Sequence, residues 1–89
     1  MLRKKVIIAN KLGLHARAAA KLVHLSSRYA SNIEVVKNER SVNGKSIMGV
    51  MMLAASKGTE IELVISGEDE TAALEALEAL IQGRFGEAE

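Results

Sequence analysis

Apolar residues recur at every second position in some segments of this chain and at helical spacing in others, and this alternation limits the possible folds more than any other feature. Residues 2–8, 33–37 and 60–66 alternate apolar with polar side chains, as half-buried strands do. Residues 16–28 and 69–83 carry apolar side chains three and four positions apart, which predicts two amphipathic helices. The residues predicted to face inward from these helices are Ala19, Leu22, Val23, Ser26, Ala73, Leu74, Leu77, Leu80 and Ile81.

Two shorter segments complete the order of elements. Asn38-Glu39 can turn the chain into a short strand at 40–43, and residues 46–54 are a candidate for a short helix. The predicted order is β-α-β-β-α-β-α. Because each strand has a single apolar face, we predict an α+β fold in which an antiparallel sheet carries helices on one face and exposes the other to water.

The composition indicates a small domain with an aliphatic core. The 89 residues leave room for one core, so we expect a single domain over 1–89, and with one Tyr, one Phe and no Trp that core must be aliphatic. The absence of cysteine excludes disulfides and thiolate metal sites. No apolar run approaches the roughly 18–20 residues of a membrane span, and the N-terminal run is too short for a signal peptide. We therefore expect a soluble, cytoplasmic monomer.

The small net charge of +1 conceals an uneven distribution. Residues 1–57 hold 11 Lys/Arg and 2 Asp/Glu, whereas residues 58–89 hold 1 Arg and 9 Asp/Glu. A basic surface of this kind fits an acidic partner or a nucleic acid. The alternative is that the charges of the two parts neutralise each other when the chain folds.

The start of the first predicted helix, Gly13-Leu14-His15-Ala16-Arg17, lacks the residues that usually cap a helix. Ser, Thr, Asp or Asn would accept hydrogen bonds from the first free backbone N–H groups. Without them, these amides and the positive end of the helix dipole form an anion site beside an imidazole and a guanidinium. Neutral imidazole is a nucleophile near pH 7, so the pattern suits a histidine that carries a phosphoryl group, which Arg17 would hold. From spacing alone, a loop histidine that merely precedes a helix remains the alternative.

A basic stripe on the first helix and an apolar short helix together predict a site for binding a partner protein. Arg17, Lys21, His24 and Arg28 recur at i, i+4, i+7 and i+11 and form one basic stripe. The segment 47–55 is apolar nearly all round, and a short helix on a small sheet cannot bury every side; we predict Val50 and Leu53 in its core-facing part. The residues expected in the docking surface are Lys21, His24, Arg28, Lys45, Ile47, Met48 and Met51. Plain core packing of 47–55 is the alternative.

Three motifs resemble those of one known family. Gly13-Leu14-His15-Ala16-Arg17-Ala18-Ala19 resembles the active-site signature of HPr, the histidine-containing phosphocarrier of the bacterial phosphotransferase system. Lys45-Ser46-Ile47-Met48-Gly49-Val50-Met51 resembles the second signature of that family, and Lys57-Gly58-Thr59 matches its turn before the last strand. The likeness covers nearly the whole chain with the same order of elements. It implies an open-faced β-sandwich, in which a four-stranded antiparallel sheet carries three helices on one face.

The resemblance also implies a function. Enzyme I, charged by phosphoenolpyruvate, would phosphorylate His15 on Nδ1, an enzyme IIA-type protein would accept the group, and Arg17 would steady it. The protein would then be a carrier rather than an enzyme, with no cofactor and no metal. The family usually has Pro at the position of Ala18, and alanine suits the helix but leaves a looser first turn. Whether such a carrier serves sugar uptake or a regulatory branch linked to nitrogen or carbon metabolism is left open by the sequence.

Ser46 has two predicted roles. It is a natural N-cap for the helix that follows it, and the resemblance makes it a candidate regulatory phosphorylation site for an HPr kinase/phosphorylase. A phosphate there would suit the helix dipole and would place negative charge inside a surface suited to acidic partners, which should impair docking.

Three other functions fit the sequence less well. Asn43-Gly44-Lys45-Ser46 ends like a nucleotide-binding P-loop, but that motif needs glycine where this chain has Glu39. His15 and His24 are nine residues apart, so on a helix they point in opposite directions and cannot share a metal ion. A small basic nucleic-acid-binding domain is the alternative from a different class. The near absence of aromatic residues argues against base stacking.

Overall fold

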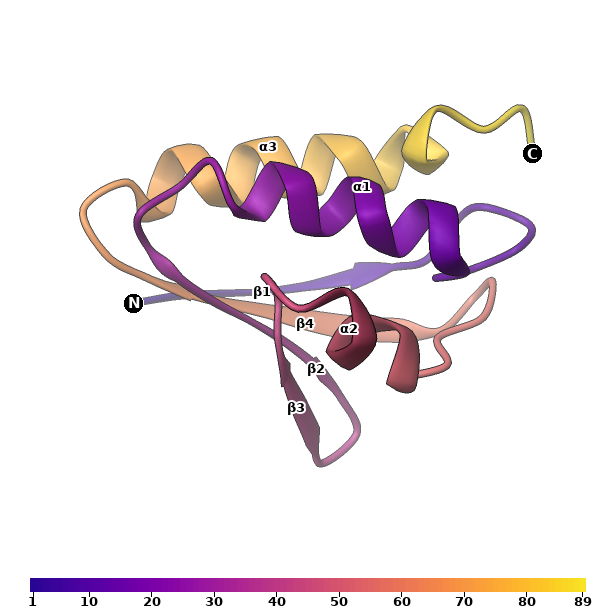
Figure 1. The fold of residues 1–89 in the computed structure, drawn as a ribbon, viewed down its shortest axis with the longest axis horizontal. Helices are drawn as coiled ribbons and strands as arrows, with labels where there is room; N and C mark the ends of the chain where they lie inside the picture. Colours follow the sequence, from indigo (N-terminus) through magenta and orange to yellow (C-terminus); the bar gives the residue numbers. More distant parts are fainter.

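The sheet has four antiparallel strands whose order in space is β1-β4-β2-β3 (Figure 1). The computed structural model describes residues 1–89 and places β1 at Leu2–Ile7, β2 at Asn32–Lys37, β3 at Arg40–Asn43 and β4 at Glu60–Ser66. β4 pairs with β1 on one side, where Val6 lies opposite Ile61, and with β2 on the other, where Val35 lies opposite Leu63. The predicted four-stranded antiparallel sheet is confirmed.

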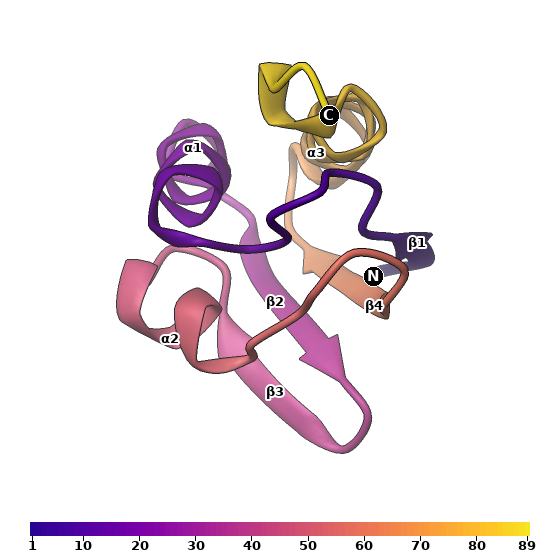
Figure 2. The same cartoon turned by 90° about the vertical axis from the view of Figure 1, so that its right-hand side faces the viewer.

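The helices all lie on one face of this sheet (Figures 1 and 2). They are α1 at Ala16–Ser26, α2 at Ile47–Met52, α3 at Glu70–Gln82 and a short 3₁₀ turn, η1, at Arg84–Gly86. α3 contacts β1 and β4, α2 contacts β3, and α1 contacts both α2 and α3. The three predicted helices and their common face are confirmed, whereas η1 was not predicted. The longest helix, α3, has 13 residues, and no helix combines the length and apolar character needed to cross a bilayer.

The core forms where the inner face of the sheet meets the apolar stripes of the helices. The apolar residues with no more than 1% exposure in these elements are Ala18, Ala19, Leu22, Ile33, Val35, Val50, Ile61, Leu63, Ile65, Ala73, Leu77, Ile81 and Phe85, and Ser26 is fully buried beside them. Burial of this apolar area is the main favourable contribution to folding. On the opposite face, Lys5 lies beside Glu62 and both reach solvent, so the sheet is open on that side as predicted.

Two helices are shorter than the sequence indicated. α1 ends at Ser26 rather than near Arg28, because the amides of Arg28 and Tyr29 bond to carbonyls only three residues back and tighten the chain into turns. α2 ends at Met52 rather than at residue 54, since Ala54 adopts a left-handed conformation (φ 52°) that a right-handed helix cannot continue. Arg28 therefore lies beyond α1, although it remains exposed.

Folding brings the basic and acidic parts of the chain together. Every ion pair of the structure joins a group from residues 1–57 to a carboxylate from residues 58–89. The pairs are the Met1 amine with Glu70, Arg3 with Glu62, Lys4 with Glu78, Lys11 with Glu89, and His15 with Glu87. Part of the charge asymmetry is thus neutralised within the molecule, and among the cations outside these pairs are Arg17 and Lys21 on α1 and Arg28 just after it.

Candidate functional site

α1 begins directly after His15, which occupies the N-cap position in an extended conformation (φ −72°, ψ 177°) and makes no side-chain cap. The amides of Ala16, Arg17 and Ala18 donate no hydrogen bond, whereas the His15 carbonyl accepts one from the amide of Ala19. The predicted lack of a cap is confirmed. The first turn of α1 therefore offers donors for an anion next to the imidazole.

The loop before α1 is held by hydrogen bonds that fix where His15 lies. Asn10 is fully buried, and its Nδ2 donates to the carbonyl of Gly13 at 2.8 Å. The amide of Leu14 donates to the carbonyl of Ala55 at 2.9 Å, which ties the start of α1 to the segment after α2. Gly13 has φ 66°, and the Ala55 backbone occupies the space that a Cβ would need, so only glycine fits there.

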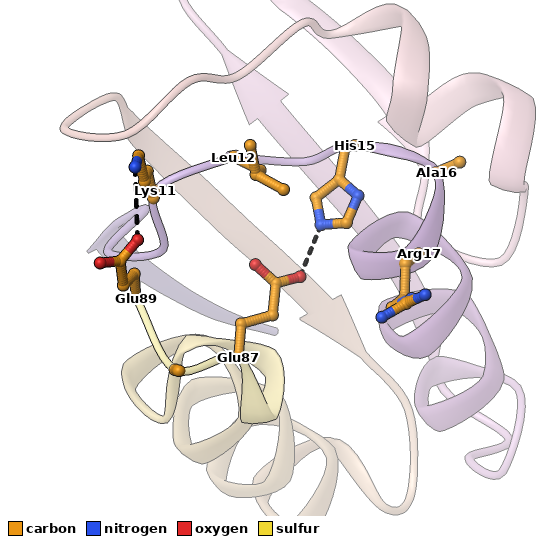
Figure 3. A pocket seen from close by; sticks show the side chains of 8 residues that line it. Lys11, Leu12, His15, Ala16, Arg17, Glu87 and Glu89 are labelled. Atoms are coloured by element: carbon orange, nitrogen blue, oxygen red, sulfur yellow. Dashed lines mark hydrogen bonds and ion pairs between the residues drawn. The ribbon is translucent and has the colours of Figure 1, made fainter.

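His15 contacts a carboxylate from the other end of the chain. Its Nε2 lies 2.5 Å from Oε2 of Glu87 (Figure 3). The two side chains are 28% and 16% exposed, so the pair sits at the surface but is partly shielded. The second carboxylate oxygen of Glu87 accepts a hydrogen bond from Nδ2 of Asn10 at 3.0 Å. Both oxygens of Glu87 are therefore engaged, one by the imidazole and one by the loop that carries it.

The hydrogen bonds to Glu87 favour its ionised form and determine which nitrogen of the His15 imidazole carries the proton. The hydrogen bond with His15, and then that with Asn10, lower the pKa of Glu87 below its ordinary value of 4.5, so this carboxyl is ionised at neutral pH. An ionised carboxylate can only accept, so Nε2 of His15 must be the donor. In the neutral ring Nδ1 then carries the lone pair, and Figure 3 shows this nitrogen on the side of the ring that faces the start of α1.

The segment that carries Glu87, residues 83–89, is attached to the molecule at several points and is called the tail below. Phe85 is buried at 1% exposure, and its carbonyl accepts a hydrogen bond from Nζ of Lys21 at 2.6 Å. The amide of Lys11 donates to the carbonyl of Glu89 at 3.0 Å, and the two side chains form an ion pair. The tail therefore runs from the end of α3 to the loop before α1, and the C-terminus can be followed there in both views of the fold (Figures 1 and 2).

An open pocket of about 780 Å³ lies between the tail and the start of α1. Its charged and ionisable lining residues are Lys11, His15, Arg17, Glu87 and Glu89. Arg17 is exposed and pairs with no carboxylate, and Figure 3 places it beside His15 on the α1 side of the pocket. The arrangement provides one nucleophilic ring, one free guanidinium and free amides around a space open to solvent.

The basic residues predicted for docking have different environments. His24 and Arg28 are exposed and make no ion pair. Lys21 is exposed, but its ammonium group donates a hydrogen bond to the Phe85 carbonyl. Lys45 is half-buried, and its Nζ donates a hydrogen bond to the carbonyl of Tyr29 at 2.7 Å. This hydrogen bond stabilises the turn after α1.

The apolar helix α2 divides into a buried and an exposed side as predicted. Val50 and Leu53 are buried, whereas Ile47, Met48 and Met51 are exposed, Met48 by 70%. Met52 and Leu12 are also exposed apolar residues and were not predicted. Ser46 is the N-cap of α2, and its Oγ accepts a hydrogen bond from the amide of Gly49 at 3.1 Å.

Glu87 and Asn10 belong to the site but were not predicted from the sequence. Glu87 lies 72 positions from His15, and no local pattern connects the two. One feature of the sequence indicated that the tail folds back. Phe85, the only phenylalanine, lies two residues after Gly83, which ends α3. A single large apolar residue after a helix indicates that the chain turns back onto the core.

Comparison with known proteins gives a consistent result. Residues 2–83 match a family model described as the PTS HPr component phosphorylation site. A phosphocarrier protein HPr from Neisseria meningitidis serogroup A is 56% identical over 89 residues and is covered, like this chain, in full. An HPr crystal structure from Thermoanaerobacter tengcongensis superimposes with a TM-score of 0.96 at 45% identity and full coverage of both chains. The structure of an HPr dimer from that organism superimposes with a TM-score of 0.79 at 46% identity, with 98% of this chain and 100% of that chain covered. The monomeric state expected for this chain therefore stays a prediction.

Proposed function

Since this chain belongs to the HPr family of the phosphotransferase system, we propose that it is a phosphocarrier whose phosphoryl group is held by His15. The group would come from phosphorylated enzyme I and pass to an enzyme IIA-type acceptor, in sugar uptake or in a regulatory branch. The protein acts as a relay with no turnover of its own, and it requires neither a metal nor a cofactor.

The observation that carries this proposal is the pairing of an imidazole with an uncapped helix start. The Nδ1 lone pair of His15 attacks the phosphorus of the donor, the new N–P bond forms as the bond to the donor breaks, and the donor keeps the electron pair. The phosphoryl group brings about two negative charges near neutral pH. The free amides of Ala16, Arg17 and Ala18 directly follow His15 and are the proposed donors to this charge, and the dipole of α1 would contribute about 0.3–1 kcal/mol.

Arg17 is proposed to hold the transferred group. Its side chain is exposed, lines the same pocket as His15 and is not tied to a carboxylate. A guanidinium can bind phosphoryl oxygens through two parallel hydrogen bonds. Because the pocket is open, these interactions are partly screened by water, which suits a carrier that must release the group to the next protein.

The docking surface proposed for enzyme I and IIA-type proteins combines the basic stripe with the exposed side of α2. It comprises Lys21, His24, Arg28, Lys45, Ile47, Met48 and Met51. The proposal is supported by the contact between α1 and α2 and by the hydrogen bond from the Leu14 amide to the Ala55 carbonyl, which joins the segment after α2 to the start of α1. One partner could therefore contact both parts together with His15. Adaptable methionine side chains suit a surface that must accept several partners in turn.

Ser46 is proposed as a regulatory phosphorylation site in that surface. It borders the exposed side of α2, and a phosphate on it would add negative charge where acidic partners are expected to bind. An HPr kinase/phosphorylase would be the enzyme that modifies it.

The test is phosphorylation with phosphoenolpyruvate and enzyme I. We expect an acid-labile phosphate on the wild type, none on His15→Ala, and normal labelling of His24→Ala, which removes the only other histidine. The labelled protein should then lose its phosphate to IIA-type acceptors, and sugar-specific or nitrogen-branch acceptors identify the branch. Absence of labelling on the wild type, or labelling that survives His15→Ala, contradicts the proposal, and salt-sensitive RNA binding without labelling supports a nucleic-acid-binding protein instead.

A further inference from the structure

We propose that Glu87 is a positioning residue for His15: it accepts the Nε2 proton, keeps Nδ1 free as the nucleophile, and balances the positive charge of the phosphorylated ring. This inference rests on the proposed phosphocarrier function and concerns a residue outside the segment 2–83 that the family model matches. The role is indirect, because Glu87 would act through the imidazole and would not touch the phosphoryl group.

The carboxylate of Glu87 is held in place by two different groups. Oε2 lies 2.5 Å from Nε2 of His15, and Oε1 accepts from Nδ2 of Asn10 at 3.0 Å. The same Nδ2 donates its other hydrogen to the Gly13 carbonyl, so both donor sites of this buried amide are used. The imidazole, the carboxylate and the loop before α1 therefore form one connected unit.

The tail keeps Glu87 in this position before any partner binds. Phe85 is inserted into the core, Lys21 donates to its carbonyl, and Glu89 pairs with Lys11 on the far side of Glu87. Anchors on both sides of Glu87 reduce the conformational entropy that an ordinary surface glutamate would lose on forming such a contact. The carboxylate is thus preorganised toward the ring.

The chemistry of transfer explains why an acceptor at Nε2 is useful. Neutral imidazole carries its proton on one nitrogen only, and that nitrogen cannot attack phosphorus. A carboxylate at Nε2 selects the tautomer in which Nδ1 holds the lone pair. When Nδ1 forms its bond to phosphorus, the ring keeps the Nε2 proton and becomes positively charged, and no proton has to move. Glu87 then faces that charge, and when the group leaves, the N–P electron pair returns to Nδ1.

The geometry distinguishes this role from autoinhibition. A carboxylate that blocked the site would lie against the free amides of α1, where the phosphoryl group binds. Glu87 instead contacts Nε2, and Figure 3 shows the other ring nitrogen on the opposite side, toward Ala16 and Arg17. The tail can therefore stay in place while Nδ1 is phosphorylated.

The test compares Glu87→Ala with Glu89→Ala, which removes an equal charge from the same tail. Glu89→Ala keeps both hydrogen bonds of the Glu87 carboxylate and the main-chain hydrogen bond from Lys11 to residue 89. Nitrogen-15 NMR of the free, unphosphorylated protein near pH 8 reports the tautomer of His15 directly. We expect the wild type and Glu89→Ala to hold the proton on Nε2, and Glu87→Ala to show a mixture of both tautomers. Phosphorylation of Glu87→Ala by enzyme I should be slower by about threefold to tenfold, as expected for the loss of one hydrogen bond.

Each outcome of this comparison is decisive. An unchanged tautomer in Glu87→Ala, or a faster phosphorylation, overturns the positioning role, the latter by revealing a blocking tail. A tautomer change of equal size in Glu89→Ala shows that tail attachment alone matters and also overturns it. The proposed carrier function is tested separately, because the NMR measurement needs no phosphoryl donor. A wild type that accepts no phosphate contradicts the carrier function and the rate prediction, but it leaves the tautomer measurement valid.

Discussion

The ammonium group of Lys21 donates a hydrogen bond to the main-chain carbonyl of Phe85, 2.6 Å away. This contact joins the outer face of α1 to the tail. Lys21 therefore has a structural role in addition to its proposed role in docking. Reversing its charge would remove a proposed partner contact and also loosen the segment that carries Glu87. The cation that tests docking most directly is Arg28, which is exposed and makes no ion pair.

Arg28→Glu should weaken binding to enzyme I about threefold to tenfold at low salt, and the difference should shrink as salt rises, because exposed charges act mainly through screened long-range attraction. Affinity is measured by calorimetry at two ionic strengths. Lys5→Glu is the matched control, since Lys5 is exposed on the open face of the sheet, away from α1. Equal effects of both variants would show that only net charge matters, and no effect of Arg28→Glu at low salt would remove it from the docking surface.

Phe85→Ala should destabilise the protein by about 3–5 kcal/mol, because it removes a buried aromatic side chain and leaves a cavity between α3 and the tail. Urea unfolding measures the loss. The NMR signal of the His15 imidazole should change as well, since the anchor that holds Glu87 is gone. Arg84→Ala, next to it but exposed, should alter stability by less than about 0.5 kcal/mol. A stable Phe85→Ala variant with an unchanged His15 signal would contradict the anchoring role.

The contact between the tail and His15 should be lost in acid. The folded-state pKa of Glu87 lies below the ordinary value of 4.5, because His15 and Asn10 donate hydrogen bonds to its ionised form. The contact therefore contributes fully above pH 4.5 and disappears as the pH falls through the lowered pKa. NMR titration of the His15 and Phe85 signals between pH 7 and 2 measures this. A tail that detaches at or above pH 4.5 would contradict the stabilisation of the carboxylate by its two donors.

Periodicity predicted the elements well because each one buries a single face. The alternation at 60–66 corresponds to β4 without error, since Ile61, Leu63 and Ile65 all point into the core. The ends of α1 and α2 were predicted less well. Those ends depend on local turns after Ser26 and on the left-handed conformation of Ala54, which the apolar pattern does not encode.

The site could be predicted only where it is local in sequence. His15 and the uncapped helix start are neighbours, so their juxtaposition follows from the helix itself. Glu87 reaches His15 through the packing of Phe85 and through the turn that η1 makes after α3, both of which are tertiary features. Asn10 could not be recognised either, because an asparagine in a loop is normally exposed, and its hydrogen bond to Glu87 exists only when the tail is folded back.

Ser46→Ala and Ser46→Asp should separate the structural role of this residue from the regulatory one. Alanine removes the cap on the Gly49 amide and should cost about 0.5–2 kcal/mol of stability, with little effect on partner binding. Aspartate also caps helices, so it should preserve stability but weaken enzyme I binding by its charge. Thr71→Asp adds the same charge on α3 and should leave binding unchanged. Stability is measured by urea unfolding and binding by calorimetry. Normal binding by Ser46→Asp would argue against charge-based regulation.

Met48→Ala should reduce affinity for enzyme I and for IIA-type acceptors while changing stability by less than about 0.5 kcal/mol, because Met48 is 70% exposed and contributes little to the core. Leu53→Ala, on the buried side of the same chain segment, should behave in the opposite way and cost about 2–5 kcal/mol of stability. Ile7→Ala is the control for exposed apolar area, since Ile7 is exposed on β1. If Met48→Ala binds like the wild type, or if Ile7→Ala loses as much affinity, the exposed side of α2 is not the apolar part of the docking surface.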